Sequence, residues 1–160
     1  MTTIFAQKID GHFVSRTEAE GTIYFLYPRE IFRGEGDGRM MSHDLTVRPE
    51  CDSTVMNFTY RMATPTPIDS VAVTSSGGLK VGRKAKRLFL EPDGKEWVHR
   101  YSLEGHYGEF KRFYSVEHPV RVELYTKDGK SFMYVADQKA WRKYSPIGGA
   151  IFSVIELNVD

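Results

Sequence analysis

The stretch VRVELYTKDGKSFMYV, residues 120–135, decides the fold class. Two runs of alternating apolar and polar residues flank an Asp-Gly pair at 128–129, a pair favoured where a two-residue hairpin loop needs positive φ. With 128–129 as the loop, Leu124 faces Met133 on the apolar side, and Tyr134 points to the other side. The stretch therefore predicts an antiparallel hairpin with one buried face.

Two more Asp-Gly pairs stand between apolar runs and extend the pattern. The pair at 10–11 separates residues 3–9 from residues 12–17, and the pair at 93–94 separates residues 85–91 from residues 95–103. With 93–94 as a two-residue loop, Arg87 falls opposite Arg100. Like charges directly opposed in a sheet are unfavourable unless solvent or an anion neutralises them.

Further runs read as strands from their alternation and their β-branched or aromatic content. They are residues 22–27, 45–48, 54–60, 70–74, 110–116 and 150–159. So many short strands between turn signals predict one mainly β domain over residues 1–160, an antiparallel β-sandwich or jelly-roll-like barrel. The alternative is a single curled sheet with a helix plugging one end.

One helix is predicted over residues 137–145. Asp137 is a good N-cap, the following turns are basic, and Pro146 is expected to end the helix. Trp141 and Tyr144 lie three residues apart and share one face. They either plug the open end of the β structure or form an aromatic contact for a partner. A second short turn is expected at 29–32, after Pro28.

Composition excludes several classes of protein. The chain has 160 residues, 22 basic and 21 acidic side chains, and 13% aromatic residues. A disordered chain has few aromatic residues and a large net charge, and this chain has neither. A protein that coats nucleic acid is strongly basic, whereas the net charge here is +1. No run approaches the roughly 20 apolar residues of a membrane span, so no membrane association is expected. The lone Cys51 forms no internal disulfide, and a cytoplasmic location is expected.

The basic run over residues 80–87 carries five positive charges and is the strongest candidate for a binding site. Aromatic residues follow it in the chain, and bases interleaved with aromatics hold phosphates and stack on rings. The alternative is a solvated strand whose lysines block edge pairing. The candidate residues for an anionic partner are Arg83, Lys84, Lys86, Arg87 and Arg100.

No pattern points to a metal, a cofactor or a catalytic residue. The five histidines lack the i, i+4 spacing of a helical zinc pair, although His99, His106 and His118 could meet in space. Glu50 and Asp52 flank Cys51 and disfavour its thiolate. The glycine-rich loop at 34–38 has too few carboxylates for calcium, and residues 75–80 (SSGGLK) lack the ending of a phosphate-binding P-loop.

The sequence therefore predicts a non-catalytic binding protein. The favoured partner is another protein with an acidic face, which docks near residues 83–87 and Arg100. One alternative is a binder of nucleic acid or of an anionic ligand through the same basic run. The other is a small hydrolase or carbohydrate-active β protein that uses His106, Glu109 and a distant acid. No pattern specifies an oligomeric state.

Overall fold

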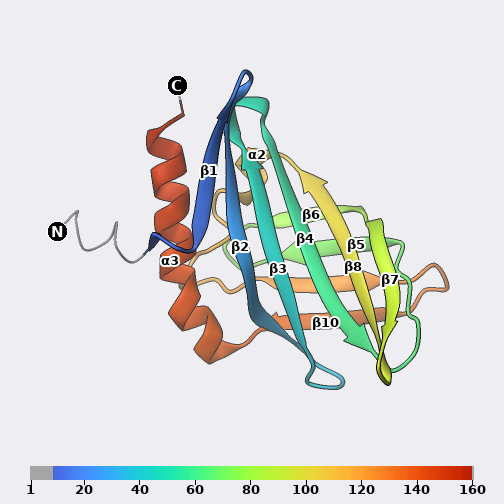
Figure 1. Ribbon diagram of the computed structural model, residues 1–160. Helices are drawn as coiled ribbons and strands as arrows, with labels where there is room; N and C mark the ends of the chain where they lie inside the picture. The colour runs from blue at the N-terminus through green and yellow to red at the C-terminus, as the bar shows by residue number, and fades with distance from the viewer. Residues whose placement is uncertain (1–8, 160) are drawn as a thin grey trace.

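The computed structural model describes residues 9–159, and strands dominate it (Figure 1). Ten strands form one antiparallel sheet in the order β6-β5-β9-β10-β2-β3-β4-β8-β7, with β1 added beside β2. The strands are β1 (Phe13–Glu18), β2 (Gly21–Gly34), β3 (Met40–Arg48), β4 (Ser53–Met62), β5 (Ser70–Thr74), β6 (Lys80–Lys84), β7 (Lys86–Asp93), β8 (Glu96–Gly105), β9 (Arg121–Tyr125) and β10 (Ser131–Ala136). The helices are η1 (Pro49–Cys51), α2 (Tyr107–Phe110) and α3 (Gln138–Leu157).

Two strand features curl this sheet until it is nearly closed into a barrel. β2 is 14 residues long, and its first half pairs with β1 while its last residues pair with β10. At the two ends of the sheet, β6 pairs with β5 and β7 pairs with β8, yet only Ala85 separates β6 from β7. The chain from β6 to β7 therefore joins the two ends. The predicted mainly β, antiparallel fold class is confirmed.

The interior of the barrel is filled by large side chains that form one continuous core. Alternation along the strands produces it: in β4, every second residue from Thr54 to Tyr60 is buried. β8 follows the same rule with His99, Tyr101 and Leu103. The largest fully buried side chains are Trp141, Tyr60, Tyr101, Tyr134, Phe32, Phe58, Phe110 and Phe113.

The C-terminal helix α3 begins where the sequence predicted and ends much later. Asp137 is its N-cap, and its carboxylate accepts a hydrogen bond of 3.1 Å from the Ala140 N–H. The helix runs on through Pro146, so the predicted strand over residues 150–159 is wrong. Buried residues Tyr144, Gly148, Ile151, Phe152 and Ile155 recur at helical spacing along one face.

α3 approaches the rest of the fold closely at Gly148. A Cβ atom at this position would lie 2.5 Å from the ring of Tyr114, closer than any real contact. Glycine therefore lets the helix backbone lie against that ring. Burial of this face outweighs the hydrogen bond that Pro146, which has no N–H, cannot make.

Two other local predictions are wrong. Residues 110–116 contain the end of α2 and a series of turns rather than a strand, and Phe113 and Tyr114 in them are buried. Residues 29–32 belong to β2 rather than to a turn, although the pairing of β2 with β3 shifts register on both sides of Arg29–Glu30. The predicted strand at 3–9 falls almost wholly outside the described residues.

The predicted hairpins at 128–129 and 93–94 exist, but their registers differ. The one at 10–11 lies partly outside the described residues. At β9–β10 the loop has three residues, 127–129, because the Thr126 N–H donates to the Lys130 carbonyl and the Gly129 N–H donates to Thr126. Tyr134, rather than Met133, therefore joins the buried face opposite Val122. At β7–β8 the loop is 94–95, so Phe89 faces Arg100.

The left-handed glycine of the β9–β10 loop gives a first prediction. Gly129 has φ +89°, and no atom lies within 4 Å of the place that its Cβ would occupy. Gly129→Val is expected to lower the free energy of unfolding by about 1–2 kcal/mol, because an L-residue resists positive φ. Urea unfolding measures this. The control is Gly36→Val, in a loop with equal space but no positive φ, and equal losses in both variants would contradict the argument.

Candidate functional site

At one end of the barrel, the loop of residues 63–69 lies against buried rings of β4 and β8. The Tyr60 hydroxyl donates to the Thr66 carbonyl at 2.9 Å, and the Thr66 N–H donates to His99 Nε2 at 2.8 Å. The Tyr101 hydroxyl accepts from the Ile68 N–H at 3.1 Å. Three rings therefore hold the backbone of this loop, which we call the strap.

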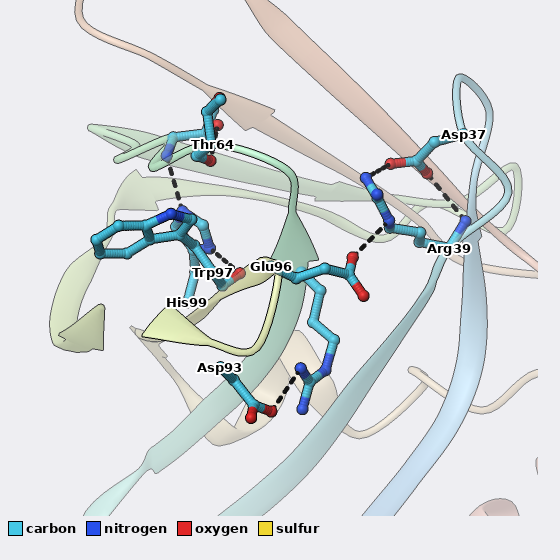
Figure 2. Close-up of polar contacts among 9 residues, drawn as sticks. Asp37, Arg39, Thr64, Asp93, Glu96, Trp97 and His99 are labelled. Atoms are coloured by element: carbon cyan, nitrogen blue, oxygen red, sulfur yellow. Dashed lines mark hydrogen bonds and ion pairs between the residues drawn. The ribbon is translucent and has the colours of Figure 1, made fainter. Parts of the chain in front are cut away.

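His99 is fixed in one neutral form. Its Nδ1 lies 3.0 Å from the Trp97 carbonyl and donates to it, which leaves Nε2 as the acceptor for the strap. Burial lowers the pKa of His99, and the bond to the Trp97 carbonyl opposes part of that shift. The ring also stacks on Tyr60 at a centroid distance of 4.5 Å. Figure 2 shows His99 between the Trp97 backbone and the segment that carries Thr64.

A pocket of about 840 Å³, which we call the mouth pocket, opens beside the strap. Apolar side chains of Met62, Ile68 and Phe132 contribute to its wall, together with the two prolines of the strap. Five basic and two acidic residues also line it: Arg39, Lys84, Arg87, Lys127, Lys130, Asp69 and Asp128. The pocket therefore combines an apolar wall with an excess of positive charge.

Arg87 enters the mouth pocket because β7 is irregular. The register with β8 shifts between Arg87 and Phe89, so Arg87 lies opposite Tyr101 rather than opposite Arg100 as predicted. The Tyr101 ring points into the barrel and is 1% exposed. Residues directly opposite in a sheet share a face, so the Arg87 side chain points toward the barrel interior and lines the pocket.

The basic residues of the pocket differ in how they are neutralised. Arg39 contacts Asp37 at 2.9 Å and Glu96 at 2.8 Å, as Figure 2 shows. Lys130 lies 4.0 Å from Asp128. Within residues 9–159, no carboxylate lies within 4.0 Å of the charged groups of the others, Lys84, Arg87 and Lys127. These three cations are available to an anion.

The five basic residues predicted to bind one partner do not lie together. Arg83 makes two hydrogen bonds to the Glu109 carboxylate, at 2.9 and 3.1 Å, which tie β6 to α2. Arg100 lies on the outer face, where it bonds Asp44 and Thr59, each at 2.9 Å. Lys86 pairs opposite Ser102 and is exposed on that outer face. Only Lys84 and Arg87 meet in the mouth pocket.

Trp141 and Tyr144 are not available as an aromatic contact for a partner. Trp141 is 2% and Tyr144 is 4% exposed, and the Trp141 Nε1–H donates to the Ser115 carbonyl at 3.1 Å. The predicted aromatic contact for a partner is therefore wrong, because both rings point into the core.

The histidines named in the sequence analysis lie in different places. His99 bonds the strap, His106 Nδ1 lies 3.0 Å from Asp52 Oδ2, and His118 Nδ1 lies 3.0 Å from the Ser76 hydroxyl. Within the described part of the chain, no three His, Cys, Asp or Glu residues gather as a metal site would require.

Glu109, the acid named in the hydrolase alternative, already has two partners within the chain. The carboxylate of Glu109 accepts from Arg83 and from the backbone N–H of His106, at 2.9 Å in each closest contact. Both groups hold this carboxylate in place at the start of α2. Glu109 therefore stabilises the local structure at the start of α2, and the hydrolase alternative stays a prediction.

Sequence reasoning missed the strap and the loop lysines of the pocket. Residues 64–67 (TPTP) read only as a loop, and Lys127 and Lys130 stand on either side of a turn that any solvated hairpin could have. The sequence offers only a weak signal for this pocket. A proline-rich segment follows an aromatic strand, and lysines stand at the turn of the β9–β10 hairpin. Only the folded sheet brings these segments together.

No family model, curated protein or solved structure matches the chain, so its own geometry carries the functional argument. Among the helices that the structure describes, none has both the length and the apolar character to cross a membrane.

Proposed function

We propose that this chain is a non-catalytic binding protein whose ligand is an amphiphilic anion taken in the mouth pocket. The observation that carries the proposal is Arg87, an arginine that points into the pocket. Among the described residues, no carboxylate lies within 4.0 Å of its guanidinium. Other arginines around it, Arg39, Arg83 and Arg100, each contact a carboxylate of the chain.

The shape and lining of the pocket support a small ligand. Its volume of about 840 Å³ lies in the range of small-molecule sites, which combine apolar walls with a few convergent polar groups. Arg87 offers a planar fork of donors that matches a carboxylate or sulfate, and Lys84 and Lys127 add charge. Met62 and Phe132 offer the surface for an apolar tail.

The earlier candidates, an acidic protein face or a nucleic acid, find less support in this arrangement. Both need a broad basic surface. Here Arg83 and Arg100 are engaged by carboxylates, and Lys86 lies on the opposite face of the sheet from Arg87. The lone cysteine supports a reducing compartment, and we place the protein in the cytoplasm as part of this proposal.

The test is the binding of dodecanoate, measured by isothermal titration at low ionic strength. We expect Arg87→Gln to weaken the affinity about tenfold to hundredfold, the effect of losing a hydrogen bond to a charged group. The matched control is Arg61→Gln, which removes an exposed arginine of β4 that pairs with Asp93 at 2.8 Å outside the pocket. Its affinity should equal that of the wild type.

Three further ligands separate the alternatives. Dodecanol, which has no charge, should bind more weakly than dodecanoate if the basic side chains select the ligand. A polyglutamate peptide that binds more tightly than dodecanoate, and loses this affinity in Arg87→Gln, would replace the small ligand with an acidic protein. An oligonucleotide with the same behaviour would point to nucleic acid. Equal dodecanoate affinity in the wild type and Arg87→Gln would refute the proposal.

A further inference from the structure

A second basic groove lies at the other end of β5, away from the mouth pocket. It occupies about 740 Å³ between the β5–β6 turn, residues 75–79, and residues 108–118. β5 runs from Ser70, beside the strap, to Thr74, beside this groove, and the two pockets share no lining residue. The groove is therefore a separate site.

The turn is held rigidly against the wall of the groove. The Ser76 hydroxyl lies 3.0 Å from His118 Nδ1, and the Gly78 N–H donates to the Ser75 carbonyl at 3.3 Å. A Cβ at Gly77 would lie 2.9 Å from the His118 ring, so only glycine allows this close packing. Gly78 has φ +98°, with open space where a side chain would stand. The turn is therefore packed closely against His118, which itself lines the groove.

The charge of the groove is strongly positive. Lys80, Lys111 and Arg112 line it, and within residues 9–159 no carboxylate lies within 4.0 Å of their charged groups. Glu109 is the one acid among the lining residues. Its carboxylate is already neutralised by Arg83, at 2.9 and 3.1 Å. Three cations therefore face one space from two different segments of the chain.

We propose that this groove binds the phosphate group of a ligand. A phosphate carries more than one negative charge on several oxygens, so it accepts from donors that arrive from different sides. Lys80 approaches from the end of the turn, and Lys111 and Arg112 approach from the segment after α2. An arginine fork together with two ammonium groups is the donor set that phosphate favours. This site is independent of the anion proposed for the mouth pocket.

The test is titration with inorganic pyrophosphate at pH 7 and low ionic strength. Lys111→Gln/Arg112→Gln is expected to weaken binding at least tenfold. The matched control is Lys139→Gln/Lys143→Gln, which removes two exposed charges of α3 and should bind as the wild type does. Lys84→Gln/Arg87→Gln, in the mouth pocket, should also keep its affinity. A cooperative thermal unfolding transition, measured for each variant, serves as the control that the variant is folded.

A second arm distinguishes a soluble ligand from a lipid headgroup, since both present phosphate. Phosphatidylcholine vesicles that contain phosphatidic acid are sedimented with the protein, with and without pyrophosphate. Co-sedimentation that requires Lys111 and Arg112 would assign the phosphate to a lipid headgroup on a membrane surface. Tight pyrophosphate binding without co-sedimentation would assign the phosphate to a soluble molecule. The proposal is overturned if the wild type does not bind pyrophosphate saturably. It is also overturned if the Lys84/Arg87 variant loses binding as fully as the Lys111/Arg112 variant.

Discussion

Acidification from pH 7 to pH 4 is expected to remove about 3 kcal/mol of stability through a single buried histidine. His43 on β3 is 1% exposed, and its Nε2 lies 2.7 Å from the Tyr114 hydroxyl. Its Nδ1 lies 3.3 Å from the Arg29 carbonyl. Phe32 and Phe113 pack on the ring, with centroids at 5.1 and 5.6 Å. The imidazole is therefore enclosed by aromatic rings and satisfied in its neutral form.

Burial lowers the pKa of His43 to about 4, and the positive charge of Arg29 adds to this effect. The bond to the Arg29 carbonyl works in the opposite direction and is too weak to reverse it. In the unfolded chain the same group has a pKa of 6.5. Between pH 6.5 and pH 4 the unfolded chain therefore binds a proton that the folded chain does not. Stability is complete above pH 6.5 and falls as the pH falls through this window.

Urea unfolding at a series of pH values measures the effect. We expect a slope of up to about 1.4 kcal/mol per pH unit from this group within the window. His43→Gln should flatten the slope, because it removes the group that titrates in this window. If His43→Gln does not fold, the NMR titration of the His43 ring in the wild type replaces it. A ring that titrates near 6.5 would contradict the prediction.

The sequence carries the β architecture because alternation is a local signal. Every second residue of β4 from Met56 to Met62 and of β8 from Trp97 to Leu103 is apolar or aromatic, and these strands lie where the pattern predicts them. Registers were less accessible, since the Asp-Gly pair marks a turn without fixing its length. At Gly129 the loop has three residues instead of two. As a result Tyr134, and not the predicted Met133, lies on the buried face.

Helix α3 shows why the strand predicted over residues 150–159 is wrong. Pro146 predicts an early end of the helix, and residues 150–159 resemble a strand because Ile151 and Ile155 are an even number of residues apart. The same residues also fit helical spacing. Packing of Gly148 against the Tyr114 ring decides between the two, and that contact joins residues distant in the sequence.

The candidate site was found only in part for a related reason. Lys84 and Arg87 stand out in a basic run, and both line the mouth pocket. Arg83 and Arg100 look equivalent to them in the sequence, yet Glu109 and Asp44 engage them. These partners lie 26 and 56 residues away. A charged residue shows its free or paired state only after folding brings its neighbours to it.

Trp141→Ala is expected to cost roughly 3–5 kcal/mol of the free energy of unfolding, the range for a large aromatic removed from a core. The indole is 2% exposed, and its ring centroid lies 6.1–6.4 Å from those of Phe32, Phe113 and Tyr114. Its removal leaves a cavity among these rings. It also leaves the Ser115 carbonyl without its 3.1 Å donor, which adds to the loss.

Two variants on the same helix make the measurement decisive. Arg142→Ala changes the next residue, which is exposed, and is expected to stay within about 0.5 kcal/mol of the wild type. Trp141→Phe retains a ring but loses the donor to Ser115, so its urea midpoint should lie between those of Trp141→Ala and the wild type. Equal midpoints for Trp141→Ala and Arg142→Ala would mean that the indole faces solvent. The partner contact rejected for Trp141 and Tyr144 would then return as the better account of this face.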